Sequence, residues 1–87
     1  MLKFEPDFVA DQDNLSRVLY ADAPSGERVC FIIDRLILQG VLGGGDDAGL
    51  ALCLVERARI EAACTRAFTN RPAGRIKLQQ IDFDKPP

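Results

Sequence analysis

The pattern of apolar and polar positions predicts four strands: residues 2–5 alternate, residues 17–21 and 28–33 are rich in apolar, β-branched and aromatic side chains, and residues 75–83 form the last candidate. Pro6 should end the first strand, because proline cannot donate to a ladder, and residues 7–14 are expected to form a loop. The second and third strands are joined by Pro24 and Gly26, which are typical turn residues, so they predict an antiparallel hairpin. Residues 30–33 are all apolar, which favours a central strand.

The last strand changes face midway. Ile76 and Leu78 share one face, whereas Ile81 and Phe83 share the other. A bulge near residues 79–80 would bring all four side chains to a common face.

Two helices are predicted between the third and fourth strands. Asp34 can cap a short helix, which should end at the glycines of residues 40–45. Asp46 or Asp47 should cap a second helix that continues without a break to about Phe68. One stripe of this helix is apolar, and it contains Cys53, Ile60, Cys64 and Ala67.

These elements predict an α+β fold: a small antiparallel sheet of three to four strands with two helices packed on one face, in the order β-β-β-α-α-β. The 87 residues fit a single domain, with residues 84–87 as a frayed tail. The face that each strand turns to the core can be inverted. With that choice open, the expected core comprises Phe4, Val18, Tyr20, Cys30, Ile32, Leu36, Leu54, Ile60, Cys64, Ile76 and Leu78.

The first two turns of the long helix, residues 50–55, are apolar all round. One helix on one sheet cannot bury every side of such a segment, so either the short helix covers the rest or a second subunit does. Leu50, Leu52 and Val55 are therefore a predicted self-association site, and the expected partner is a second copy of the chain, in a homodimer, or another protein.

Composition excludes several classes of chemistry. The chain has no His, which rules out Ser-His-Asp and Cys-His catalysis and His-based zinc or haem sites. Its net charge of −2 gives no overall attraction to nucleic acid or an anionic membrane. The three cysteines form no CxxC pair and lie among apolar neighbours, so they are expected to be core thiols rather than nucleophiles or ligands. No signal core or membrane-spanning run is evident, which favours a cytoplasmic protein.

Basic residues are concentrated in the second half, where residues 57–77 carry six of them against Glu61 alone. Arg66, Arg71 and Arg75 bracket the end of the long helix, where cations suit the helix dipole. The functional alternative is a guanidinium patch that binds a carboxylate or phosphate. No aromatic side chains are interleaved with these arginines, which argues against nucleic acid as the partner.

Two further motifs are candidate ligand-binding sites. The glycine-rich residues 40–47 resemble a phosphate loop, but no Lys-Ser/Thr follows, and Asp46 and Asp47 would repel a phosphate. Asp11 and Asp13 offer oxygen ligands to a divalent cation, yet Leu15 and Ser16 follow where a calcium loop needs another ligand and a glycine. A helix connector and a solvated loop are the preferred interpretations, and no cofactor or small-molecule substrate is predicted.

The order of landmarks along nearly the whole chain resembles that of domain-of-unknown-function family 1488, a family of short bacterial proteins. The landmarks are Phe4-x-Pro6, Val18-x-Tyr20, Gly26, Val29-Cys30-x-Ile32, the acidic helix start before Leu36, Arg59-Ile60-Glu61 and Gly74-x-Ile76-x-Leu78. The family brings no assigned activity and no catalytic residues. We therefore expect a non-enzymatic cytoplasmic module that self-associates or binds a protein, with a weak binder of nucleic acid or an anionic ligand as the alternative.

Overall fold

A hairpin lies at the centre of the sheet in the computed structural model, which describes residues 1–10, 16–44 and 50–83. Strands β2 (Arg17–Asp22) and β3 (Arg28–Ile33) pair antiparallel along their whole length. Gly26 adopts a φ of 89° in the turn and donates its N–H to the Ala23 carbonyl over 2.8 Å. The predicted hairpin is confirmed, and its glycine supplies the left-handed conformation that other residues avoid.

Two edge strands complete a four-stranded sheet in the order β1-β2-β3-β4. Strand β1 (Lys3–Ala10) pairs antiparallel with β2 and shifts register between Phe4 and Phe8. The expectation that Pro6 ends this strand is wrong, because the irregularity accommodates the proline and the strand continues beyond it.

Strand β4 (Arg75–Lys77) runs parallel to β3, so the sheet is mixed and differs from the expected antiparallel one. The chain leaves β3, passes through helices, and returns in the same direction. A connection of this kind places a helix over one face of the sheet.

The helical segments are η1 (Ile37–Val41, a π-helix), α1 (Leu50–Val55), α2 (Arg57–Asn70) and α3 (Gln80–Phe83). The long helix is divided at Glu56, whose φ of −96° and ψ of 17° are not helical. Residues 81–83 were expected in the last strand but lie in α3. This helical turn explains the change of face between Leu78 and Ile81 without a bulge. The predicted caps at residues 46–47 and the predicted tail at 84–87 lie outside the described residues.

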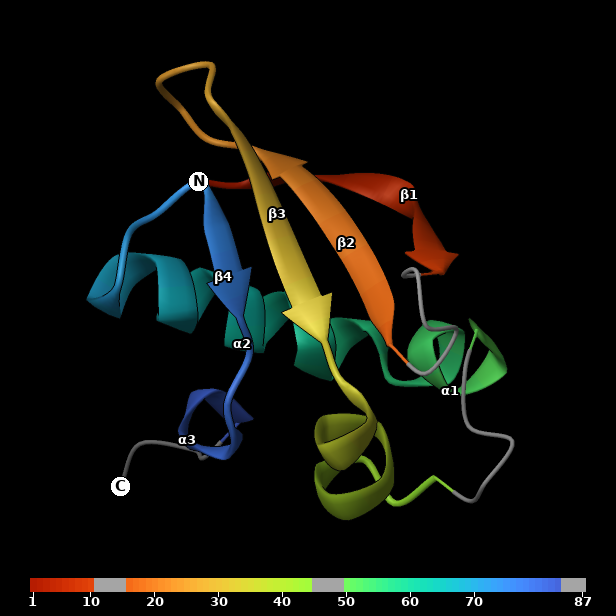
Figure 1. The fold of residues 1–87 in the computed structure, drawn as a ribbon. Coiled ribbons are helices and arrows are strands. Elements are labelled where there is room, and N and C mark those ends of the chain that lie inside the picture. The colour runs from red at the N-terminus through yellow and green to blue at the C-terminus, as the bar shows by residue number, and fades with distance from the viewer. Residues whose placement is uncertain (11–15, 45–49, 84–87) are drawn as a thin grey trace.

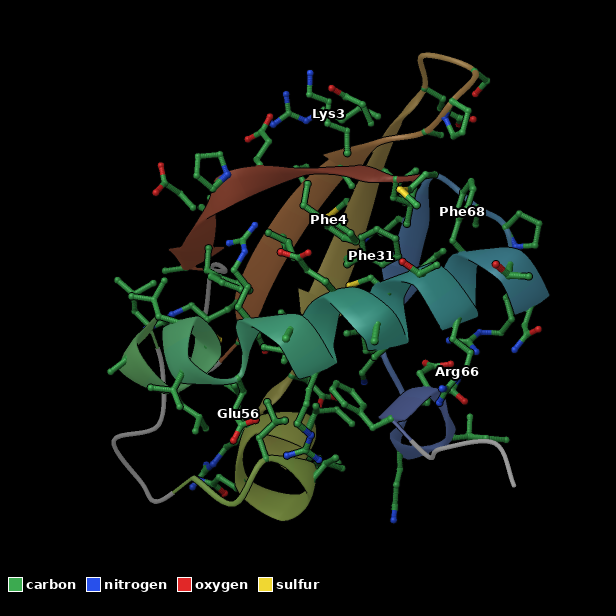
Figure 2. All side chains as sticks on the ribbon, turned by 180° about the vertical axis from the view of Figure 1, so that it is seen from behind. Lys3, Phe4, Phe31, Glu56, Arg66 and Phe68 are labelled. Carbon is green, nitrogen blue, oxygen red and sulfur yellow. The ribbon has the colours of Figure 1, made fainter. Side chains whose placement is uncertain are left out.

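Helix α2 crosses one face of the sheet, and the opposite face is turned to the viewer in Figure 1. Figure 2 shows the covered side, with Phe4 and Phe31 between α2 and the strands. The buried residues of α2 are Ile60, Ala63, Cys64 and Ala67. They pack in one cluster with the inward residues of the sheet. The α+β fold is confirmed.

The faces of β2 and β3 are inverted relative to the predicted core. Leu19 and Phe31 are completely buried in the main cluster, whereas their neighbours Tyr20 and Ile32 are half-buried on the other face. Both strands are apolar on both sides, so alternation could not select the inward face. The predicted core positions Ile60, Cys64, Ile76 and Leu78 are confirmed.

The expectation that Leu36 and Leu54 are core residues is wrong, since their exposed fractions are 77% and 53%. Both belong to the short helical segments near the edges of the molecule. No helix in the described part of the chain is both long and apolar enough to cross a membrane.

Candidate interaction surface

The face of the sheet opposite α2, called the outer face below, carries cross-strand rows of side chains. One row crosses all four strands through directly paired residues: Val9, Val18, Ile32 and Lys77. The next row contains Tyr20, Cys30 and Arg75. At the β1 edge no residue pairs directly with Tyr20, because the register shifts between Phe4 and Phe8; the exposed Asp7 belongs to this stretch, immediately before the inward Phe8.

The centre of the outer face is apolar. Tyr20, Cys30 and Ile32 are half-buried, Val18 is buried, and Val9 is exposed at the edge. None of the described helices lies over this face (Figure 1). A sheet with one solvated face normally carries polar residues there, so the centre of this face is more apolar than usual.

Charged groups border the apolar centre at the hairpin end. The Arg28 guanidinium lies 2.8 Å from a Glu5 carboxylate oxygen, and its carbon lies 4.3 Å from the centre of the Tyr20 ring. This pair joins β1 to β3 across β2. The arrangement holds the Tyr20 ring in place and marks one limit of the apolar area.

The structure separates the three predicted arginines. Arg66 donates from Nη1 to the Asp82 carbonyl over 3.0 Å, and Arg71 donates to both Asp82 carboxylate oxygens over 2.8 Å each. Arg75 lies instead on β4, in the second row of the outer face. Arg66 and Arg71 therefore tie α2 and the residue after it to α3.

Asp82 is the residue that sequence reasoning missed, and its side chain is only 1% exposed. Burial alone would raise the pKa of this carboxyl, but hydrogen bonds from Arg71 and from the Gln79 N–H lower it below its ordinary value overall. The same contact with Asp82 raises the pKa of Arg71. The sequence pattern places Asp82 in the last predicted strand, residues 75–83, and contains no signal of this role.

The predicted self-association residues on α1 have different environments. Leu50 and Val55 are 47% and 80% exposed, and the exposed Leu54 lies beside them, whereas Leu52 packs against the core. Leu50, Leu54 and Val55 form what is called the α1 patch below.

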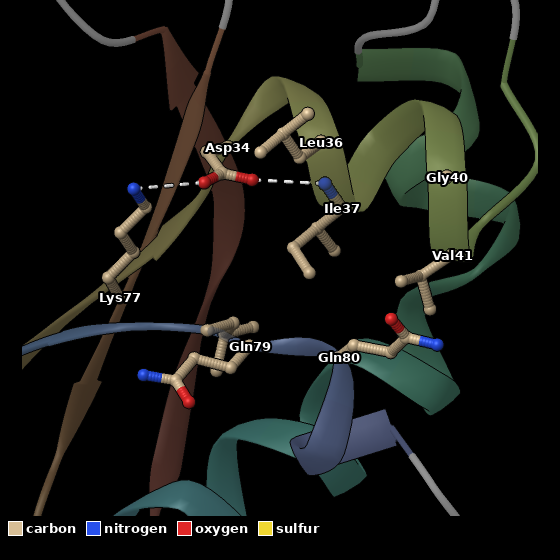
Figure 3. A pocket seen from close by; sticks show the side chains of 9 residues that line it. Asp34, Leu36, Ile37, Gly40, Val41, Lys77, Gln79 and Gln80 are labelled. Carbon is tan, nitrogen blue, oxygen red and sulfur yellow. Dashed lines mark hydrogen bonds and ion pairs between the residues drawn. The ribbon is translucent and has the colours of Figure 1, made fainter.

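A pocket of about 400 Å³ opens between η1 and the segment that joins β4 to α3 (Figure 3). It is lined by Asp34, Leu36, Ile37, Gly40, Val41, Lys77, Leu78, Gln79 and Gln80. Asp34 accepts the Ile37 N–H over 3.0 Å, which confirms its predicted capping role, and its other oxygen lies 3.1 Å from Lys77 Nζ. This carboxylate is thus engaged on both oxygens, and the pocket suits an apolar group better than proton transfer.

Two of the three cysteines are core thiols, as predicted. Cys53 and Cys64 are fully buried, and burial raises the pKa of each thiol, so neither is poised as a nucleophile. Cys30 is half-buried on the outer face. Within the described ranges no group of three or more Cys, Asp or Glu residues is placed to hold a metal ion. The candidate ligands Asp11 and Asp13, and Asp46 and Asp47 of the glycine-rich segment, lie outside those ranges.

Comparison with known proteins gives no relative: no family model matches the chain, and neither a curated protein nor a solved structure matches it. The resemblance to family 1488 stays a prediction. Function must therefore be argued from the surfaces described above.

Proposed function

We propose that the chain is a non-catalytic protein-interaction module whose working unit is a homodimer. The observation that carries this proposal is the apolar outer face, which the described helices leave uncovered. Strand β3 is apolar at four consecutive positions, residues 30–33, a pattern typical of strands buried on both faces. Helix α2 covers only one of these faces, and a second copy would cover the other.

The size of the outer face favours it over the α1 patch as the main contact. Strands lie about 4.8 Å apart with a rise of about 3.3 Å per residue, so the central pair of six-residue strands with its two edge strands covers at most roughly 19 by 20 Å, and less at the three-residue β4. This area is below that of standard specific interfaces and in the range of weak, transient ones, so we expect a weak dimer that forms only at high protein concentration. The α1 patch presents three side chains on one short helix.

The chemistry of the candidate reactive groups supports a non-catalytic role. The carboxylates of Asp34 and Asp82 are each held by a basic side chain and a backbone N–H. The thiols of Cys53 and Cys64 are buried with a raised pKa. Thiols used as core hydrophobes suit a reducing compartment, so we place the module in the cytoplasm.

Light scattering coupled to size exclusion tests the proposal at protein concentrations from 1 to several hundred micromolar, on the order expected for a small interface. We expect the wild-type mass to rise from one chain to two. Ile32→Lys should stay monomeric, because it places an ammonium group in the apolar centre, while Leu54→Lys should dimerise like the wild type. Circular dichroism confirms that both variants fold, and Ile32→Thr offers a milder change at the same position.

A wild-type chain that stays monomeric throughout this range would contradict the proposal. Loss of the dimer in Leu54→Lys with retention in Ile32→Lys would assign the contact to the α1 patch instead of the outer face.

A further inference from the structure

We infer that the two copies pack outer face to outer face about a two-fold axis parallel to the strands, so that β1 of each copy lies over β4 of the other. This inference rests on the proposed function and adds the geometry of the dimer and the charges that select it. It is carried by two features, the order of side chains within the rows and the distribution of charge between the two edges of the sheet.

The two edges of the outer face differ in charge. Strand β4 carries Arg75 and Lys77, whereas β1 carries Glu5 and Asp7 with Lys3. Glu5 and Lys77 already have ion-pair partners within the chain. Among the described residues neither Asp7 nor Arg75 makes an ion pair, although both are exposed. One copy therefore presents an unpaired acid at one edge and an unpaired base at the other.

The axis follows from the sheet order. Rotation about a line between β2 and β3 exchanges β1 with β4 and β2 with β3, and it keeps the height of each row along the strands. In the first row Val18 then faces Ile32 of the partner. In the second row Tyr20 faces Cys30 of the partner, and the β1 edge with the exposed Asp7 comes over the β4 edge with Arg75 of the partner. Apolar groups meet apolar groups at the centre. At each edge Val9 meets the aliphatic stem of Lys77 of the partner, and Asp7 and Arg75 bring opposite charges together.

The other simple face-to-face dimer, with its axis across the strands, places β4 over β4 of the partner. Arg75 and Lys77 would then lie against the same basic residues, and Asp7 would lie near Asp7 of the partner. Like charges that face one another disfavour this arrangement. Sheets packed face to face lie about 10 Å apart with strands within about 30° of alignment, which brings the long side chains of the edges within reach.

Charge reversal at the two edges tests the axis. Asp7→Lys and Arg75→Glu should each weaken dimerisation about tenfold, since each dimer contains the contact twice and each contact changes from attraction to repulsion. The double variant Asp7→Lys/Arg75→Glu should regain wild-type affinity, and an equimolar mixture of the two single variants should form the heterodimer. The assay is sedimentation equilibrium at low salt, where surface charges are least screened.

Arg35→Glu is the matched control, because it changes the net charge as Arg75→Glu does from an exposed position near η1, and it should leave the dimer unchanged. A double variant that stays as weak as the single variants would overturn the inferred axis. Single variants with wild-type affinity would overturn it as well, while loss of the dimer in Ile32→Lys would still support the proposed function. A monomeric wild-type chain would overturn both.

Discussion

The ion pair between Arg71 and Asp82 should be the most sensitive polar contact in the molecule. Arg71→Gln removes both guanidinium donors and leaves the buried Asp82 carboxylate with the Gln79 N–H at 2.8 Å and the Arg66 side chain nearby. Loss of one partner of a fully buried pair costs about 3–5 kcal/mol. The Arg71 side chain is 36% exposed, so solvent screening reduces this, and we expect a loss of about 2–3 kcal/mol.

This loss is large for a chain of 87 residues, whose total stability should be about 4–13 kcal/mol. Thermal unfolding followed by circular dichroism should show a midpoint lowered by roughly 10–20 °C. Arg35→Gln is the matched control, because Arg35 is exposed, lies outside the proposed dimer contact and makes no ion pair among the described residues. It should change stability by less than about 0.5 kcal/mol.

The effect should also depend on pH. The pKa of Asp82 is lowered in the folded chain, so the pair contributes stability above the unfolded-state pKa of about 3.9 and loses it as the pH falls through the folded-state pKa. The stability difference between the wild type and Arg71→Gln should therefore shrink in acid. Equal unfolding midpoints for Arg71→Gln and Arg35→Gln at neutral pH would refute this reasoning.

Two further predictions concern the backbone of β1 and the glycines. Arg57 donates to the Glu5 and Pro6 carbonyls over 2.6 and 2.8 Å, so Arg57→Ala should lower the free energy of unfolding in urea by about 1.5–3 kcal/mol. The control Arg59→Ala breaks one exposed ion pair and should lower it by less than about 1 kcal/mol. Equal losses would contradict the role of Arg57 in holding the β1 backbone. Gly40→Ala should stabilise the fold by about 0.5–1 kcal/mol, because a Cβ there meets nothing within 4 Å and φ is not positive. Gly26→Ala should destabilise it by about 1–2 kcal/mol, because φ is 89° at this position. Changes of the same sign in urea unfolding would contradict this backbone argument.

Features with local causes could be predicted from the sequence. The hairpin is specified by its turn residues, and the cap at Asp34 by one side chain next to a helix start. The stripe of α2 followed the helical period, so Ile60 and Cys64 were placed in the core correctly.

Features that depend on partners distant in the sequence could not be predicted from it. The apolar faces of β2 and β3 are equally good candidates for the core, and only the position of α2 decides between them. The parallel pairing of β4 depends on the path of the intervening helices. Asp82 becomes structural only because α3 brings it to Arg71. Part of the proposed interaction surface could be recognised in the apolar residues 30–33, but its location opposite α2 could not.

Cross-linking at Cys30 tests the dimer most directly, because this thiol lies in the second row of the outer face while Cys53 and Cys64 are fully buried. In the inferred dimer the two Cys30 backbones lie about 11 Å apart, from a sheet separation of about 10 Å and an offset of one strand. A bismaleimide with a short spacer should join two wild-type chains under native conditions, and Cys30→Ser should abolish the product. Absence of a cross-linked dimer from the wild type, or an equal yield from Cys30→Ser, would contradict a dimer formed through the outer face.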